Sequence, residues 1–312
     1  MKQVKTIAVA FFFATIFTAN AQDSIERVVE TSTTAGHWSH LPIWGDRVEA
    51  LGYKLPAPIG IGLYFNDQTM PYEATSDFSL GANGGLLGGS NIYIPKGDVR
   101  IDGRDQSLQL RADAWLFPFL NVYGLLGYTK GHKDIVANTE NVEIPGRPLL
   151  EGMLQAAGSI TIPIEYEATN VGLGAVLAGQ IDPFDWHPFI MTAVGAYTVA
   201  RTTATDNNIY TTIGAFKIGQ RYSVPGGQLA GLVGITYQRV DQNMKGSYSF
   251  KGTDLERLIE SVNYNVSLQS AETINMALTM VYDFGYAEEW SFMMEYGFLN
   301  WNQFTLSLGR RF

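Results

Sequence analysis

Residues 303–312 of the chain read QFTLSLGRRF, and this stretch decides the fold. Every second side chain is apolar except at Arg310, and the side chains between are polar or small; the apolar row is Phe304, Leu306, Leu308 and Phe312. Because successive side chains of a β-strand point to opposite faces, this alternation predicts a strand with one apolar face. Arg310 interrupts the row close to the end of the strand, where a charge on a lipid-facing side costs little.

The same period of two extends back through the chain. Residues 273–284 show it most clearly, with Leu278 in the apolar row and Thr279 in the polar row, whereas residues 120–129 are mixed. Each candidate segment is near the roughly 9–11 residues that a tilted membrane strand needs. The ten segments are residues 59–66, 106–116, 120–129, 171–181, 188–200, 210–222, 229–243, 273–284, 292–298 and 303–312.

The links between these segments alternate between short and long. Short turns occupy 117–119, 182–186, 224–227 and 285–289, and longer polar links occupy 67–105, 130–170, 201–209 and 244–272. This rhythm is typical of a transmembrane β-barrel with long loops outside, and an even strand number places both termini at the periplasmic side. A sheet in lipid must close on itself, because every backbone N–H and C=O needs a partner. A soluble, secreted barrel or sandwich is the alternative, since its strands are also apolar on one face.

Aromatic side chains gather beside the short turns, where an interfacial girdle is expected. They are Trp115, Phe117, Phe119, Phe184, Trp186, Tyr222, Phe284, Tyr286 and Trp290. The chain is therefore predicted to be all-β, an antiparallel up-and-down transmembrane barrel of about ten strands within a range of about eight to twelve. Residues 91–101 and 149–167 are the places where an extra hairpin would fit.

On these residues the chain resembles Gram-negative outer-membrane β-barrel proteins. Its last strand ends on the aromatic Phe312, similar to the C-terminal signal that such barrels present to the barrel assembly machinery. Residues 41–46 (LPIWGD) and 113–119 (DAWLFPF) are similar to stretches of uncharacterised proteobacterial outer-membrane proteins. The resemblance implies a place in the cell outer membrane, with outer-membrane lipid and lipopolysaccharide as partners, and it implies no specific function.

The first 21 residues predict a secretory signal peptide. Lys2 and Lys5 give a positive start, residues 7–17 are apolar, and residues 19–21 (ANA) form a small-x-small cleavage site. The apolar run is shorter than the roughly 20 residues that a transmembrane helix needs. The predicted division is a signal peptide at 1–21, an N-terminal periplasmic leader or plug at 22–58, and the barrel at 59–312. A leader is preferred over a plug because chain termini are commonly loose; short helices are expected at 23–30 and 44–51.

Composition and motifs exclude several classes of function. The chain has no Cys, which excludes disulfides, thiolate metal sites and a cysteine nucleophile. A net charge of −9 and a pI near 4.9 give no basic footprint for nucleic acid. Residues 84–89 (GGLLGG) lack the strand-to-helix context and the Lys of a phosphate-binding loop, so they predict a flexible loop and no cofactor. Residues 254–261 are expected to form a short amphipathic helix in the last long link.

Histidines are weighed as candidates for chemistry. Residues 37–40 (HWSH) have a spacing that suits a metal or hydrolase site, yet no acidic third ligand lies at a diagnostic distance, so no metal site is predicted. His187 lies in a Pro-flanked turn that explains it structurally, and His132 lies in a polar link without a visible partner. No catalytic residue is assigned, and an outer-membrane lipid A hydrolase or protease is kept as the alternative function.

Charges in the polar rows of the strands are the most informative candidates. Six are expected to face the lumen: Arg111, Asp113, Lys217, Arg221, Asp283 and Glu295. Because both signs occur, the charges either pair to fill a small barrel or line a narrow passage. A barrel of about ten strands is closer to the filled size than to the roughly 16–18 strands of an open pore. The prediction is a structural or surface-interaction role, or slow passage of small solutes through a narrow lumen; the oligomeric state is left open.

Overall fold

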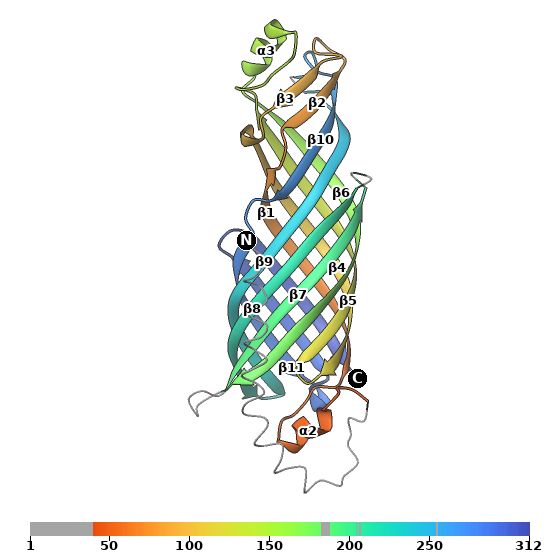
Figure 1. Ribbon diagram of the computed structural model, residues 1–312, viewed down its shortest axis with the longest axis vertical. Helices are drawn as coiled ribbons and strands as arrows, with labels where there is room; N and C mark the ends of the chain where they lie inside the picture. Colours follow the sequence, from red (N-terminus) through yellow and green to blue (C-terminus); the bar gives the residue numbers. More distant parts are fainter. Residues whose placement is uncertain (1–39, 182–187, 204, 206, 254) are drawn as a thin grey trace, which may run out of the picture.

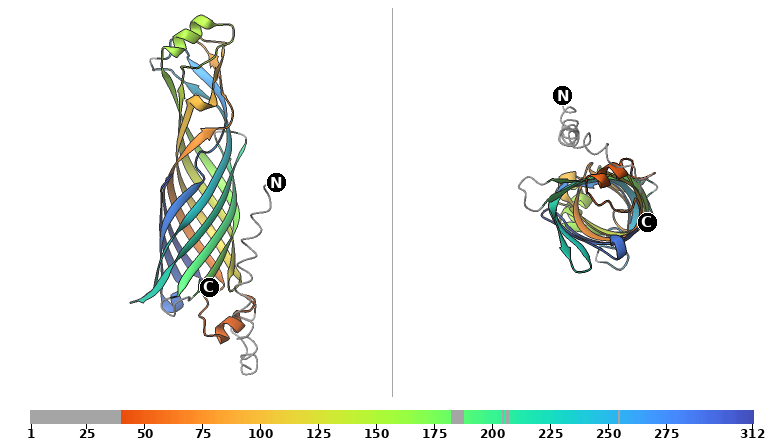
Figure 2. Two further views of the ribbon diagram at one scale, coloured as in Figure 1. Left: turned by 60° about the vertical axis from the view of Figure 1, so that its left-hand side comes forward. Right: turned by 90° about the horizontal axis from the view of Figure 1, so that it is seen from below.

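The structure of the protein, a computed structural model, describes residues 40–181, 188–203, 205, 207–253 and 255–312. Within these residues, 13 strands form one antiparallel sheet (Figure 1). Ten of the strands close into a ring in the order β11-β12-β13-β1-β4-β5-β6-β7-β8-β9 and back to β11. The view along the ring is shown on the right of Figure 2. The predicted all-β barrel of about ten strands is therefore confirmed.

Strands of the ring are long, and most of them tilt across the wall of the barrel (Figure 1). Their bounds are β1 Ile59–Ala74, β4 Val99–Phe117, β5 Leu120–Asn138, β6 Ser159–Ile181, β7 Phe189–Thr202, β8 Asn208–Val224, β9 Gly227–Ser249, β11 Ile274–Phe284, β12 Trp290–Phe298 and β13 Asn302–Arg311. The other described elements are β2 Phe78–Asn83, β3 Asn91–Ile94, β10 Ser261–Ser270, α2 Gly45–Ala50, α3 Pro148–Gln155 and the 3₁₀ turns Lys96–Asp98 and Tyr286–Glu288.

Each of the ten predicted segments corresponds to a ring strand. The prediction that the long links are loops is wrong. Strands β1, β4, β5, β6 and β9 run far into them, and β2, β3 and β10 lie wholly within them. The expected helix at 254–261 is also wrong, because residues 255–258 form turns and β10 begins at Ser261. Residues 84–89 form the turn that joins β2 to β3.

Part-way along the strands, the apolar face changes from the outer side of the barrel to the inner side, and the polar face changes from the inner side to the outer. On β1 the outward side chains change from Leu63 and Phe65 to Asp67, while the inward ones change from Asn66 to Met70. The outward change falls between residues 106 and 108 on β4, 128 and 130 on β5, 169 and 171 on β6, and 237 and 239 on β9. The strand continues with its side chains alternating as before, but the apolar face is now the inner one. A link that is predicted to be a polar loop is therefore a strand whose polar face points outward.

Two regions result from this exchange. Outward apolar side chains, each exposed by 38% or more, surround the lower barrel and form what we call the apolar band: Ile59, Ile61, Leu63, Phe65, Leu108, Leu110, Leu126, Tyr128, Val171, Leu173, Leu177, Tyr197, Tyr210, Val233, Ile235, Tyr237, Ile274, Leu278, Met294, Tyr296 and Leu308. Above it, residues 67–106, 130–169 and 239–271 form the lobe, at the top of Figure 1. An ordinary hydrophobic core fills the lobe, with fully buried side chains that include Phe78, Leu80, Ile92, Ile101, Ile135 and Ile162.

Aromatic side chains mark both edges of the apolar band. Five exposed tyrosines lie at the lobe edge: Tyr128, Tyr197, Tyr210, Tyr237 and Tyr296. Of the predicted girdle at the short turns, Phe184 and Trp186 lie outside the described residues. Trp115 does not belong to a girdle, because it pairs with the inward Asn121 and its ring lies 5.7 Å from the Arg311 guanidinium.

Both described ends of the chain lie at the short-turn end of the barrel, at the bottom of Figure 1. The Ile43 N–H donates to the Leu116 carbonyl, and the Trp44 ring packs 5.1 Å from that of Phe117, so α2 is held at the rim. The Phe312 N–H donates to the Ile59 carbonyl at 2.8 Å, where β13 meets β1. The predicted signal peptide and the helix expected at 23–30 lie outside the described residues. Among those that are described, no helix is long and apolar enough to cross a membrane.

Candidate functional site

The lumen inside the apolar band is occupied by charged side chains, and one group centres on Asp113. Its carboxylate accepts hydrogen bonds from Arg311 at 2.7 Å and from Asn121 at 2.6 Å, and it lies 3.7 Å from the Nε of Arg111. These side chains come from β4, β5 and β13, which the ring brings together although Arg311 is almost at the chain end. We call them the Asp113 cluster.

Aromatic packing fixes the position of Arg111 in this cluster. Its guanidinium donates to Asn121 at 2.9 Å and lies 3.9 Å from the centre of the Tyr123 ring, a cation–π contact. The Tyr123 ring extends over Gly174 of the neighbouring strand, and a side chain at that position would overlap it. A glycine in the wall therefore makes room for the ring that holds the arginine.

A second group joins strands that are not neighbours in the ring. Lys217 on β8 forms an ion pair with Glu295 on β12, and β9 and β11 lie between them. The two side chains are only 13% and 12% exposed, and Thr279 donates a further hydrogen bond to Glu295 at 2.8 Å. Nearer the short turns, Arg221 donates to Asp283 at 3.1 Å. These contacts connect β8 with β11 and β12 across the lumen.

Each of the six predicted lumen charges thus lies on the inner face, in the pairs Arg111–Asp113, Lys217–Glu295 and Arg221–Asp283. Sequence reasoning did not select Arg311 or Asn121. Arg311 shares the polar row of the last strand, so its position could have been inferred, whereas Asn121 lies in the mixed segment. Phe312, the predicted assembly signal, is exposed at the end of the barrel.

Small side chains line the remaining part of the lumen wall. On β6 and β7 the inward positions include Gly172, Gly174, Ala196 and Thr198, which face one another in pairs across the two strands. Each of these residues is partly exposed. The ionic groups come from the other strands, and the Tyr123 ring that packs on Arg111 reaches this wall at Gly174.

A further polar group lies where the lumen meets the lobe core. Lys133 is 1% exposed and donates to the Tyr166 hydroxyl at 2.6 Å. The Tyr72 hydroxyl donates to Asp105 at 3.2 Å, and the Tyr166 hydroxyl donates to the other oxygen of the same carboxylate. We call Tyr72, Asp105, Lys133 and Tyr166 the junction cluster. The alternation does not predict this cluster, because its residues lie in the links 67–105 and 130–170, which are expected to be loops.

Burial controls the protonation of the junction cluster, which lies above the apolar band. Loss of solvent lowers the pKa of the Lys133 ammonium, although Asp105 acts in the opposite direction. Burial and the nearby Asp105 charge raise the pKa values of the Tyr72 and Tyr166 hydroxyls well above their usual range. The nitrogen of Lys133 also lies 4.6 Å and 4.4 Å from the centres of these two tyrosine rings. The ammonium is therefore held mainly by aromatic rings and a hydroxyl.

The histidines do not assemble a chemical site in the part of the chain that the structure describes. His132 lies 3.1 Å from Asp134 on the outer face of the lobe, so the expectation that it has no partner is wrong. Residues 37–39 of the HWSH stretch and His187 lie outside the described residues. Among the residues that are described, no group of three or more His, Asp or Glu could hold a metal ion.

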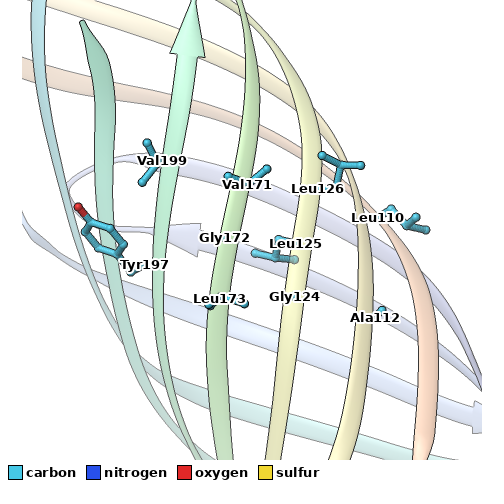
Figure 3. A pocket seen from close by; sticks show the side chains of 10 residues that line it. All are labelled: Leu110, Ala112, Gly124, Leu125, Leu126, Val171, Gly172, Leu173, Tyr197 and Val199. Carbon is cyan, nitrogen blue, oxygen red and sulfur yellow. The ribbon is translucent and has the colours of Figure 1, made fainter.

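The outer surface of the band carries a shallow groove over β4 to β7 (Figure 3). Its volume is about 720 Å³, and small residues such as Ala112 and Gly124 lie among the larger Leu110, Leu126 and Leu173. This groove belongs to the apolar surface and is separate from the charged lumen. Its shape and apolar lining suit hydrocarbon chains.

No protein-family model and no curated protein matches the chain. Solved structures with a similar arrangement include the translocator domain of the autotransporter NalP from Neisseria meningitidis, with a TM-score of 0.36 and 10% identity over 96% of this chain and 98% of that one. An outer-membrane channel from Pseudomonas putida F1 has a TM-score of 0.32 and 12% identity over 90% and 100% of the two chains. The P. putida toluene transporter TodX gives 0.30 and 10% over 82% and 91%.

These neighbours are outer-membrane β-barrels of Gram-negative bacteria. The described residues form a closed antiparallel β-barrel. At TM-scores of 0.36 or less and identities of 12% or less, these neighbours do not establish what the protein does, which must be argued from its own lumen and lobe.

Proposed function

We propose that this protein is a closed outer-membrane barrel with a structural and surface-interaction role, which holds its lobe at the cell surface. The observation that carries the proposal is the buried apolar core of the lobe, which lies above the lumen. Inward side chains of the lobe, among them Ile101, Ile135 and Ile162, are fully buried. A hydrated solute that moves up the lumen meets the junction cluster and then this core, and removing its water there would be costly.

The proposed orientation places the lobe outside the cell and both termini in the periplasm. Residues 1–21 would direct export, the assembly machinery would read Phe312, and outer-membrane lipid would surround the apolar band. Short turns at one end and a large polar-surfaced lobe at the other support this orientation, because barrels of this class carry their longer segments outside.

A second candidate is slow passage of small solutes. The partly exposed small residues on β6 and β7, such as Ala196 and Thr198, favour it, because they leave water-accessible surface along one wall. Passage would still require the lobe core to separate from the top of the lumen.

Conductance in planar bilayers tests the closed barrel. Folded protein, checked by its heat-dependent electrophoretic mobility, is expected to insert without conductance steps, while a general porin in the same bilayers gives steps. Release of a small sugar from vesicles, without steps, would favour slow passage. Regular steps from the folded wild-type protein would refute the closed barrel.

Cysteine labelling tests the orientation, and the chain contains no Cys to interfere. Leu149 on α3 is 85% exposed at the lobe tip, and Tyr286 is 93% exposed at the short turns. Leu149→Cys should react with a membrane-impermeant maleimide on intact cells. Tyr286→Cys should react only after the outer membrane is permeabilised; the reverse pattern would contradict the proposed orientation.

A further inference from the structure

A step in the barrel wall lies just above the apolar band. Strand β8 begins at Asn208, whereas its neighbour β9 continues upward to Ser249. The ladder between them ends at the pair Tyr210–Asp241, so from Gln242 onward the edge of β9 that faced β8 pairs with no strand among the described residues. A hollow of about 350 Å³ lies at this step. This volume falls at the lower end of the range for ligand pockets, roughly 300–1,000 Å³.

Side chains that both donate and accept hydrogen bonds dominate the lining of the hollow. Asn207 donates to Asn243 at 3.0 Å, and Asn243 donates to Ser267 at 2.7 Å, so the three groups are held in fixed positions. Each retains unused hydrogen-bonding capacity. Asp241, the one charged residue among the described residues of the lining, is paired with Arg239 at 3.0 Å. The lining therefore suits an uncharged ligand with many hydroxyl groups.

Gln242 lies on β9 between Asp241 and Asn243, but its side chain belongs to the inward row of the strand. The residue is 5% exposed, and neither its amide nitrogen nor its amide oxygen has a hydrogen-bond partner. Native proteins leave few buried polar groups unpaired, because each costs free energy. The groups that a ligand in the hollow can reach are therefore those of Asn207, Asn243 and Ser267, and the buried Gln242 amide is not counted among them.

Tyr210 supplies an aromatic surface beside these polar groups. Its ring is exposed and lies 6.3 Å from that of Tyr197 in a stacked arrangement. Both tyrosines belong to the lobe edge of the apolar band, where the hydrocarbon of a membrane gives way to headgroups. Amide groups above an exposed aromatic ring can contact both the hydroxyls and the C–H face of a sugar.

We propose that the hollow at the β8–β9 step binds a neutral saccharide. In the proposed orientation it faces the sugars of lipopolysaccharide in the outer leaflet, so the source of the saccharide, though not the chemistry of the site, rests on the proposed function. A free oligosaccharide from the medium has the same chemistry, and the experiment below separates the two sources.

Binding measurements on the full-length mature protein in nanodiscs test the proposal with three probes. They are rough lipopolysaccharide that contains core sugars, lipid A without core sugars, and the released core oligosaccharide. Asn243→Leu removes the central amide, and its affinity for a sugar-containing probe should fall at least about tenfold, as expected when two hydrogen bonds are lost. Asn263→Leu, on the exposed outer face of β10 away from the hollow, is the matched control and should bind like wild type.

Variants of the aromatic residue give a second readout. Tyr210→Phe should keep most of the affinity and Tyr210→Ala should lose it, while all variants retain the heat-dependent mobility of a folded barrel. Binding of lipopolysaccharide but not of the free oligosaccharide identifies the membrane as the source, and equal binding of both identifies any matching sugar. The proposal is overturned if lipid A binds as well as lipopolysaccharide, if neither sugar probe binds, or if Asn243→Leu equals its control. Failure of the closed barrel would instead appear as conductance.

Discussion

The Lys217–Glu295 pair offers the sharpest perturbation of the lumen. Lys217→Met leaves Glu295, only 12% exposed, without its counter-charge. Removal of one partner of a buried pair costs about 3–5 kcal/mol, because the remaining charge stays desolvated. Thr279 still donates to Glu295, so we expect a loss near the lower value, about 3 kcal/mol. Glu295→Gln should cost a similar amount, since it leaves the lysine uncompensated.

The double variant Lys217→Met/Glu295→Gln removes both charges and should recover most of the loss, to within about 1 kcal/mol of wild type or above it. Urea unfolding of the protein in phospholipid vesicles, followed by tryptophan fluorescence, measures all four free energies. The matched control is Arg221→Met near the mouth; because the Arg221 side chain is 46% exposed and Asp283 is 19% exposed, this variant should cost less than Lys217→Met. If the two single losses simply add in the double variant, the pair does not exist in the folded lumen.

Three further outcomes follow from the two regions of the barrel. Leu278→Arg, on the outward apolar face near the middle of β11, should cost about 2–4 kcal/mol in the proposed membrane location and hinder assembly, whereas Thr279→Ser on the inner face should be mild; vesicle folding yields compare them. Ile135→Ala in the lobe core should lower the free energy of unfolding by about 2–5 kcal/mol in urea titrations, and a loss below that range would mean the core is loose. Because burial lowers the pKa of Lys133, the unfolded state holds its proton to higher pH, so stability should rise with pH between that lowered pKa and the ordinary 10.5. The raised pKa values of Tyr72 and Tyr166 have the opposite effect and lower the stability as the pH rises above 10.0. Lys133→Met, compared with wild type across the same pH series, should abolish the rise in stability.

The barrel strands could be predicted because one face of each strand is apolar and the other polar, as the proposed contact with lipid requires. The alternation in 273–284 and 303–312 needs no tertiary information, since the outward side chains are exposed and apolar and the inward ones contact polar groups. The same rule placed the charges at Arg111, Lys217 and Glu295 in a polar row.

The lobe could not be predicted by the same rule. Beyond Asp67 the outer face becomes polar and the inner face becomes apolar, so a search for one continuous apolar row ends there. The β2–β3 hairpin joins the sheet through a pairing distant in sequence, such as Leu80 of β2 with Tyr264 of β10. The junction cluster was missed for this reason, since it brings together side chains from four strands at the point of exchange.

In the proposed membrane location, the exchange of faces exposes one strand to two solvents, water above and hydrocarbon below. The lobe core is buried from water as in any globular domain, so urea weakens it by solvating its apolar side chains and peptide groups. The proposed location surrounds the barrel wall with hydrocarbon, which urea reaches less directly. The upper part of β1 can therefore melt while its lower part stays inserted, and a partly unfolded molecule would still be anchored in the envelope.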